Sequence, residues 1–309
     1  MVDQFKFSYT AMKTTIPVLV MLLISSLSCS KKTSKEDYVS PIVKVENPIV
    51  PVEPEKTSGV TLSADGLTNT YTLINKYFGG TGDVIETPDC AHSPGAPHIT
   101  QIYDELLKKY VFAFQIHVSP DNDRCLPATD RQRNEIKTYD KSPDSLLASL
   151  NETVRYSWKF KLDKDFKPSP NFTHIHQIKA LDGDDDLPLI TFTARYKSSG
   201  NKLEVIHTGG TGTTSLKYIA SVPLSDFMGE WVEVKEEVSF SFDGKYQVLI
   251  KRISDGKTLL DLTVNNIDLW RDATTLCRPK WGIYRSLLSP EYIRDEQIRF
   301  NDFNITEIK

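Results

Sequence analysis

Apolar and polar residues alternate one by one along several stretches of this chain. Between positions 154 and 163, Val, Tyr, Trp, Phe and Leu alternate with Arg, Ser, Lys and Asp. The segment 232–242 alternates in the same way, with Val and Phe set against Glu, Lys and Ser. Because successive side chains of a strand point to opposite faces, this pattern predicts half-buried antiparallel strands.

Shorter runs of the same kind predict further strands, at 110–118, 189–196, 203–207, 246–252 and 297–307. Turn-forming pairs such as Asp243-Gly244 and Asp255-Gly256 separate them. The one helical piece expected is short, around Ser145–Leu150. Strands that follow one another without interleaved helices favour an all-β fold, an antiparallel β-sandwich or β-jelly roll. Residues 59–309 are predicted to form it as a single domain.

The first 58 residues are predicted to lie outside this domain. Lys13 precedes an apolar run, 16–24, that is too short to span a bilayer. A small residue before Cys29 resembles a bacterial lipobox, so residues 1–29 are expected to be a signal peptide that leaves Cys29 lipidated. A plain secretory signal or a short anchor are the alternatives. Residues 30–58 are a predicted linker, rich in proline.

This N-terminus predicts an exported lipoprotein that faces the periplasm or the cell surface, with the lipid as its only membrane contact. The net charge of −4 over 309 residues does not indicate a nucleic-acid partner, and we expect a monomer. An exported chain can form disulfides, and Cys90 and Cys125 are favoured because they flank the first strand pair. Sequence alone leaves the pairing with Cys277 open. No spacing of His or Cys resembles a structural zinc site.

Three segments carry candidate chemistry: Arg133–Lys137, His174–Gln177 and Lys280–Arg285. Each lies in a stretch predicted to be a strand. By strict alternation, each of the following sets shares a face: Arg133, Glu135 and Lys137; His174 and His176; Lys280 and Tyr284. If these faces line one groove, it holds cations, two imidazoles and a phenol. Such a set suits removal of a proton next to a carboxylate, followed by elimination.

The order of these segments resembles that of lyases of the alginate lyase, heparin lyase and glucuronan lyase type. The segments match the patterns R-x-E-h-[RK], [QH]-I-H and K-x-G-h-Y of those jelly rolls, over about residues 85–309. His174 stands where alginate lyases carry Gln, and Lys137 where they often carry Arg. The resemblance implies a concanavalin-like sandwich and a polysaccharide lyase that cleaves a uronate-containing polymer by β-elimination.

Residue roles follow by position from the resemblance. Tyr284 would take the C5 proton, protonate the glycosidic oxygen, or do both, with His176 as the alternative base. Arg133 and His174 would neutralise the uronate carboxylate, because fixed donors make the adjacent proton more acidic. The resemblance implies further substrate-binding residues, namely Lys280, Glu135, Lys137, Arg285 and Gln177. By alternation Gln177 points away from the histidines and reaches the groove only through a bulge.

Each segment also has an ordinary structural explanation. Arg133 and Glu135 could form a cross-strand ion pair, the histidines could be structural, and Tyr284 could be a packed strand residue. Gln115-Ile116-His117 matches the family letters but precedes Arg133 in the chain, so it is interpreted as a structural strand. Further basic residues near the motifs would favour an anionic polysaccharide as partner, namely Arg131, Lys159, Lys161, Lys179, Arg195 and Arg278.

No cofactor is expected, since the elimination needs no metal. An acidic loop at 182–186 makes Asp184 and Asp186 a candidate calcium site, with a solvated turn as the alternative. Two other functions remain open: a lectin-like lipoprotein that binds carbohydrate without turnover, and a sandwich glycoside hydrolase. The second needs paired carboxylates, and Glu233, Glu236 and Glu237 do not reproduce the spacing of sandwich glucanases.

Overall fold

The computed structural model describes residues 59–80, 83–92, 96–210 and 215–308. Contacts between Cα atoms divide the chain into two units, Met1–Glu53 and Pro54–Lys309, and every described residue belongs to the second. The predictions for the signal peptide, for Cys29 and for the linker fall outside the described residues. Among the described residues, no helix has the length and apolar character needed to cross a membrane.

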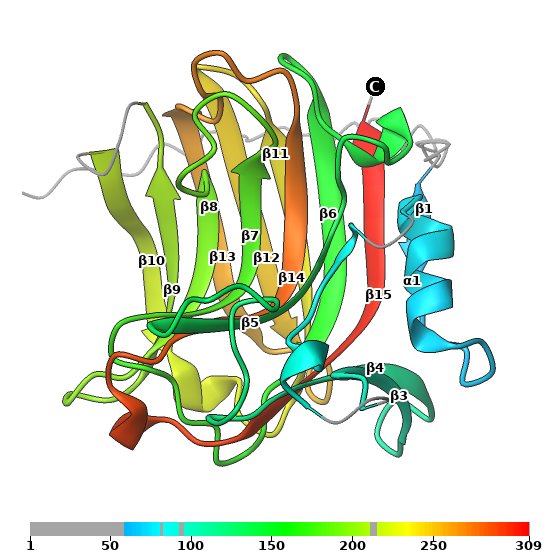
Figure 1. Ribbon diagram of the computed structural model, residues 1–309. Coiled ribbons are helices and arrows are strands. Elements are labelled where there is room, and N and C mark those ends of the chain that lie inside the picture. Colours follow the sequence, from blue (N-terminus) through cyan, green and yellow to red (C-terminus); the bar gives the residue numbers. More distant parts are fainter. Residues whose placement is uncertain (1–58, 81–82, 93–95, 211–214, 309) are drawn as a thin grey trace, which may run out of the picture. The chain divides into compact units, whose positions relative to one another are not determined.

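The second unit is a sandwich of two sheets in which all paired strands are antiparallel (Figure 1). One sheet has seven strands, in the spatial order β10 (Leu216–Pro223), β9 (Lys202–Thr208), β8 (Ile190–Arg195), β7 (Thr173–Ala180), β14 (Cys277–Ser286), β5 (Arg131–Lys137) and β2 (Ile85–Glu86).

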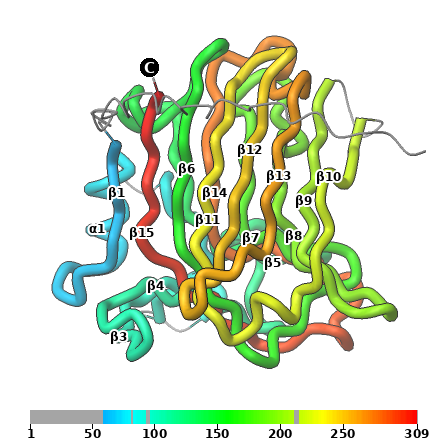
Figure 2. Tube along the Cα trace, turned by 180° about the vertical axis from the view of Figure 1, so that it is seen from behind, coloured from blue at the N-terminus to red at the C-terminus, as the bar shows by residue number. Residues whose placement is uncertain are grey.

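The other sheet has eight strands. Figure 2 shows the molecule from the side opposite to that of Figure 1. The order of these strands is β13 (Thr258–Ile267), β12 (Gly244–Arg252), β11 (Trp231–Ser239), β6 (Thr153–Lys161), β15 (Glu296–Ile308), β4 (Lys109–Ile116) and β3 (Ile99–Asp104), with β1 (Val60–Leu62) paired to β15. The predicted all-β sandwich of jelly-roll type is therefore confirmed.

The segments that alternate in the sequence form the strands whose two faces differ most in burial. Along β6 every second residue is buried, from Val154 to Phe160. Its neighbour β11 pairs in register, with Val234 opposite Trp158, so the apolar rows of both strands face the same way. The period-2 pattern predicts these strands well because one of their faces meets solvent and the other meets the second sheet.

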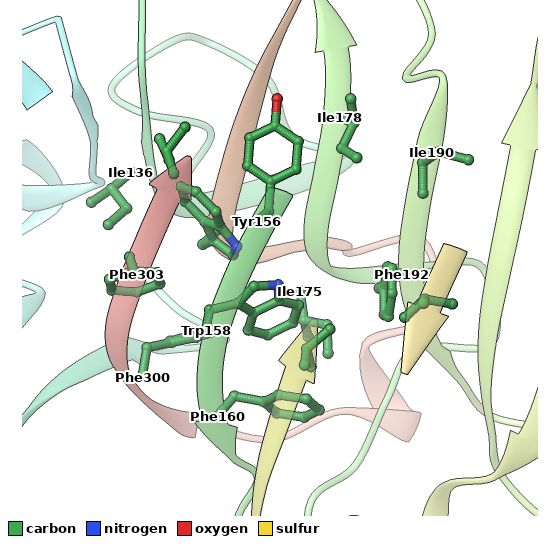
Figure 3. Packing of buried hydrophobic residues seen from close by; sticks show 14 of the residues in the cluster. Ile136, Tyr156, Trp158, Phe160, Ile175, Ile178, Ile190, Phe192, Phe300 and Phe303 are labelled. Atoms are coloured by element: carbon green, nitrogen blue, oxygen red, sulfur yellow. The ribbon is translucent and has the colours of Figure 1, made fainter. Parts of the chain in front are cut away.

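Aromatic side chains fill the space between the sheets, as Figure 3 shows. The Trp158 ring lies 5.1 Å from Phe160 and 6.0 Å from Phe300. From the seven-stranded sheet, Trp281 reaches Phe303 at 5.1 Å. Each such side chain, when fully buried, contributes about 1.5–3 kcal/mol to folding. This layer fixes which side of the seven-stranded sheet is the core side and which is the outer side.

The helical prediction was wrong in place. Residues 144–146 form only a short 3-10 turn, whereas an α-helix, α1, spans Thr70–Phe78 at one edge of the unit. Asn69 caps α1 by accepting hydrogen bonds from the backbone N–H groups of its first turn, and Gly79 ends it in the left-handed region at φ 73°. The helix buries Leu73, Ile74 and Phe78. A helix of nine residues with three buried apolar positions is too short for the helical period to be recognised in the sequence.

Candidate active site

The three candidate segments lie side by side in the seven-stranded sheet. Strand β14 runs between β5 and β7, so each residue of β14 has a neighbour on both sides. Tyr284 lies opposite Arg133 on one side and opposite His174 on the other, and Lys280 lies opposite Gln177. His174 and Tyr284 lie about 40 and about 150 residues after Arg133 in the chain, yet all three meet on one sheet.

Strand β7 is interrupted by a β-bulge. His174 pairs with Thr193 of β8, but His176 pairs with Phe192, so β7 has one residue more than β8 over this stretch. Ile175 and His176 both point to the core side and are fully buried. The expectation that His174 and His176 share a face is therefore wrong, because the extra residue reverses the alternation after His174.

His176 is enclosed between the sheets. Its ring lies 5.1 Å from that of Trp158 and 5.4 Å from that of Trp281, and its exposed fraction is 0%. Its Nδ1 lies 2.8 Å from the carbonyl oxygen of Lys280, and its Nε2 lies 3.0 Å from Glu236. A polymer on the outer side of the sheet has no access to this imidazole, so the alternative base is poorly placed for catalysis.

Tyr284 is the centre of the outer face. The guanidinium carbon of Arg133 lies 3.9 Å from its ring centroid, and Nη1 of Arg131 donates a 3.0 Å hydrogen bond to its hydroxyl oxygen. The ring of His174 lies 5.7 Å away, and Phe172 packs against both rings. Two guanidinium groups thus meet one phenol, that of Arg133 at the face of its ring and that of Arg131 at its hydroxyl.

His174 is a neutral imidazole in this position. Burial lowers its pKa to about 3, and the nearby charges of Arg195 and Arg133 act in the same direction. Its Nδ1 is buried without a hydrogen-bond partner among the described residues. At any ordinary working pH the ring is therefore uncharged and can offer one donor and one acceptor.

Two buried carboxylates, Glu86 and Glu135, lie beside Tyr284 under a shell of cations. Nζ of Lys280 lies 2.5 Å from Glu86 and 2.9 Å from Glu135. Nη1 of Arg133 lies 3.0 Å from Glu135, and Nζ of Lys137 lies 3.0 Å from Glu86. Burial alone would raise the pKa of both carboxyl groups, but these cations hold both below the usual range.

These contacts give several expected substrate ligands a different role. Glu135, Lys137 and Lys280 are buried and already paired, so they present little free charge to a polymer. They hold Arg133 in place, since its guanidinium shares Glu135 with Lys280. Glu86 has no counterpart in the motifs because it comes from a two-residue strand that shows no period in the sequence.

Gln177 and Arg285 are placed differently from each other. The bulge returns Gln177 to the outer side, where its amide donates to Glu135, as the sequence required of it. Arg285 has an exposed fraction of 0% and lies on the other side of β14 from Tyr284. It donates to Gln132 and to the carbonyl oxygen of Arg294, both at 2.6 Å. It is therefore not available to bind substrate.

Lys179 adds a further cation to the outer side of β7. Its side chain is 21% exposed and lies 3.7 Å from Asp185. Burial, helped by the charges of Lys280 and Arg278, lowers its pKa to about 8. Lys159 instead belongs to the other sheet, where it pairs with Asp302 at 2.7 Å, so it is not one of the cations around Tyr284.

The acidic loop at 182–186 does not gather its carboxylates. Asp184 lies 3.4 Å from the guanidinium of Arg271, and Asp186 is exposed. The candidate calcium ligands thus do not converge. Glu236 is buried between the sheets, where it accepts a 2.6 Å hydrogen bond from the Tyr246 hydroxyl, so a polymer on the outer side does not reach it.

A different group of side chains does converge, and no sequence motif indicates it. Within the described part of the chain, the ligand atoms of His92, His98, His117 and Asp121 all lie within 4.8 Å of one another. Their irregular spacing matches no zinc pattern. The prediction that His117 is a strand residue is wrong, because β4 ends at Ile116. The disulfide prediction is confirmed: Cys90 and Cys125 are bonded, and Cys277 is free and buried.

Comparisons with known proteins agree on one class. The family model described as "Polysaccharide lyase" matches residues 89–305. The fold is similar to that of an endo-β-1,4-glucuronan lyase from the fungus Trichoderma reesei, at 14% identity, with a TM-score of 0.50, covering 73% of this chain and 91% of that one. It is also similar to that of an alginate lyase variant in complex with an alginate trisaccharide, at 10% identity, with a TM-score of 0.52, covering 81% and 98%. No curated protein sequence matches the chain.

Proposed function

The chain belongs to the polysaccharide lyase family, and we propose that it cleaves a uronate-containing anionic polysaccharide by β-elimination on the outer face around Tyr284. The observation that carries this proposal is the arrangement of Arg131 and Arg133 around the Tyr284 phenol, with neutral His174 beside it. A module that only binds carbohydrate has no need of a phenol held between two guanidinium groups.

In the proposed reaction the Tyr284 oxygen takes the proton from C5 of the uronate. The electrons of that C–H bond form the C4–C5 double bond and the glycosidic C4–O bond breaks. The Tyr284 hydroxyl then gives the proton to the departing oxygen, which returns Tyr284 to its starting state. Arg131 stabilises the Tyr284 oxygen while it is negative, through its 3.0 Å hydrogen bond. Fixed charges of this kind need no reorganisation during the reaction, which is why they lower the barrier.

The uronate carboxylate needs its own donors, because its charge opposes removal of the C5 proton. Arg133 and His174 flank Tyr284 on the two neighbouring strands and are the groups best placed to meet it. His174 acts as a neutral hydrogen-bond donor, since burial keeps it uncharged. Lys179, further along β7, would bind a second acidic group of the polymer.

The experiment is near-ultraviolet absorbance during incubation with alginate, glucuronan, heparin, hyaluronan and pectic polymers. Elimination leaves a conjugated unsaturated uronate that absorbs, whereas hydrolysis and binding do not. We expect one polymer to give a rise that disappears in Tyr284→Phe and persists in Tyr103→Phe, a control at an exposed tyrosine of the other sheet. A flat trace across the panel, with one polymer retarding the protein in an affinity gel, would contradict turnover and favour the lectin-like alternative.

We also propose that the chain is exported and anchored through a lipid on Cys29. The support is the apolar run before a small residue and a cysteine, followed by a proline-rich segment. The bond between Cys90 and Cys125 fits an oxidising compartment. Labelling cells with a fatty-acid analogue should mark the full chain, and Cys29→Ser should abolish the label; a label that persists in that variant contradicts the proposal.

A further inference from the structure

Three of the six histidines of the chain surround one aspartate. The carboxylate of Asp121 lies in contact with Nε2 of His92, 3.2 Å from Nε2 of His98 and 3.3 Å from Nδ1 of His117. The three rings also lie near one another, with centroids 4.6, 4.9 and 5.4 Å apart. Three imidazole nitrogens gathered around one carboxylate form a group that could hold a metal ion.

The distances fit a small ion. Zinc holds imidazole nitrogen and carboxylate oxygen at about 2.0–2.2 Å, so ligands on opposite sides of one ion are at most about 4.4 Å apart. The four ligand atoms here lie within 4.8 Å of one another. Small side-chain rotations are therefore enough to bring all four into coordination.

The side chains behind the histidines orient them in the way metal sites require. Asp89 lies 2.7 Å from Nδ1 of His98, which leaves Nε2 of that ring to face Asp121. Asp89 is itself held by the hydroxyl of Tyr71 at 2.7 Å and by the backbone N–H of His98 at 3.0 Å. A carboxylate that fixes the far nitrogen of a histidine is the usual support of a metal ligand.

His117 supplies a second, independent observation. Its Nδ1 is buried and has no hydrogen-bond partner among the described residues, although it lies 3.3 Å from Asp121. The backbone N–H of His117 already donates to that carboxylate at 2.7 Å. A buried nitrogen without a partner loses its hydration and gains nothing in return, and a cation between it and Asp121 would remove that cost.

The bond between Cys90 and Cys125 ties together the two segments that supply the ligands. Cys90 lies two residues before His92, and Cys125 lies four residues after Asp121. The bridge limits how far the two segments can separate, so the ligand set is already gathered before an ion binds.

We propose that His92, His98, His117 and Asp121 bind one Zn²⁺ ion. Three imidazoles and one carboxylate suit a borderline-soft cation such as zinc, whereas calcium prefers six or more oxygen ligands. The ion acts as a structural clamp on the segment that leads into β5. That segment supports Arg133, whose backbone N–H donates to the Asn122 carbonyl at 3.0 Å and whose Nε donates to Asp123 at 2.7 Å. The clamp thus helps to position a residue beside Tyr284.

The test is the metal content of the full chain, purified, stripped with EDTA, incubated with zinc chloride and dialysed. We expect one zinc per chain by elemental analysis, and a rise of about 5 °C or more in the midpoint of thermal unfolding. Cobalt chloride in place of zinc should give the intense visible absorption of a four-coordinate site. Calcium chloride should give neither binding nor a shift.

Matched variants separate this site from general affinity for metals. The double variant His92→Gln, His117→Gln changes two partly exposed ligands and should retain less than a tenth of the zinc. His207→Gln removes a histidine that lies outside the cluster and should leave the zinc content unchanged. Equal zinc in the double variant and the parent, less than a tenth of an ion in the parent, or an equal shift with calcium would each overturn the proposal.

Discussion

The guanidinium of Arg133 lies over the face of the Tyr284 ring, 3.9 Å from its centroid, while it also binds Glu135 and Asp123. Only a planar cation with several donors can do all three. We expect Arg133→Lys to lower kcat/KM by about 100-fold, since loss of one preorganised charge at an active site has an effect of that size. Initial rates of absorbance on the polymer that the protein cleaves would measure it. Arg155→Lys, at a surface ion pair of the other sheet, should keep the rate of the parent.

His174 should make the protein less stable as the pH falls. Burial lowers its pKa in the folded state to about 3, below the ordinary value of 6.5, so the unfolded chain binds the proton more readily. This contribution is present above about pH 6.5 and is lost as the pH falls toward 3. Between about pH 6.5 and pH 4, the parent should lose about 3 kcal/mol more unfolding free energy than His174→Gln.

Denaturant titrations of both proteins at several pH values would show this difference. Arg133, Arg195, Lys280 and Glu135 face the ring and remain in both proteins, so their effect cancels in the comparison. Equal pH dependence in the two proteins would show that His174 takes up its proton as easily in the folded state as in the unfolded one.

Lys179 should make binding of the polymer sensitive to alkaline pH. Burial lowers its pKa to about 8, so its positive charge is lost as the pH rises through that value. We expect KM for the anionic polymer to rise about 3- to 10-fold between about pH 7 and pH 9.5, as one attractive charge disappears. Lys179→Arg keeps its charge and should show a flat KM over this range. A parallel rise in both proteins would assign the effect to another group.

Glu86 should be worth far more to stability than a surface carboxylate. It lies within ion-pair distance of Lys137, Lys280, Arg133 and Arg124, and is itself buried. Glu86→Gln leaves these cations without their shared partner, which should lower the free energy of unfolding by about 3–5 kcal/mol. In the control Glu237→Gln, whose partner is partly exposed, we expect a loss of about 0–1 kcal/mol. Chemical denaturation of both variants gives the comparison, and similar losses would contradict the central role of Glu86.

The sequence predicted the sandwich because the alternation in β6 and β11 directly reflects burial. It also predicted that Arg133, His174 and Tyr284 lie close together, and the three strands that carry these residues are indeed neighbours. It could not predict which residues of β7 face outward, because a bulge depends on pairing with adjacent strands and leaves the letters unchanged.

Glu86 and the group formed by His92, His98, His117 and Asp121 were missed for a related reason. Glu86 comes from a two-residue strand, and the other four residues come from connecting segments. Their proximity is created by the sheet and by the bond between Cys90 and Cys125, not by any local period. Contacts of this kind have no signature in a single sequence.

The bulge at Ile175 determines which side chains of β7 lie on the outer side of the sheet. With regular pairing, the letters His-Ile-His-Gln would present two imidazoles to the polymer and bury the amide. With the extra residue, His174 and Gln177 lie on the outer side, where the Gln177 amide binds Glu135, while His176 becomes part of the core. The chemistry offered by this strand is therefore set by one inserted residue as much as by the identity of its side chains. A shift in strand pairing alone could change which polymer such a sheet recognises, although every residue of the motif stays the same.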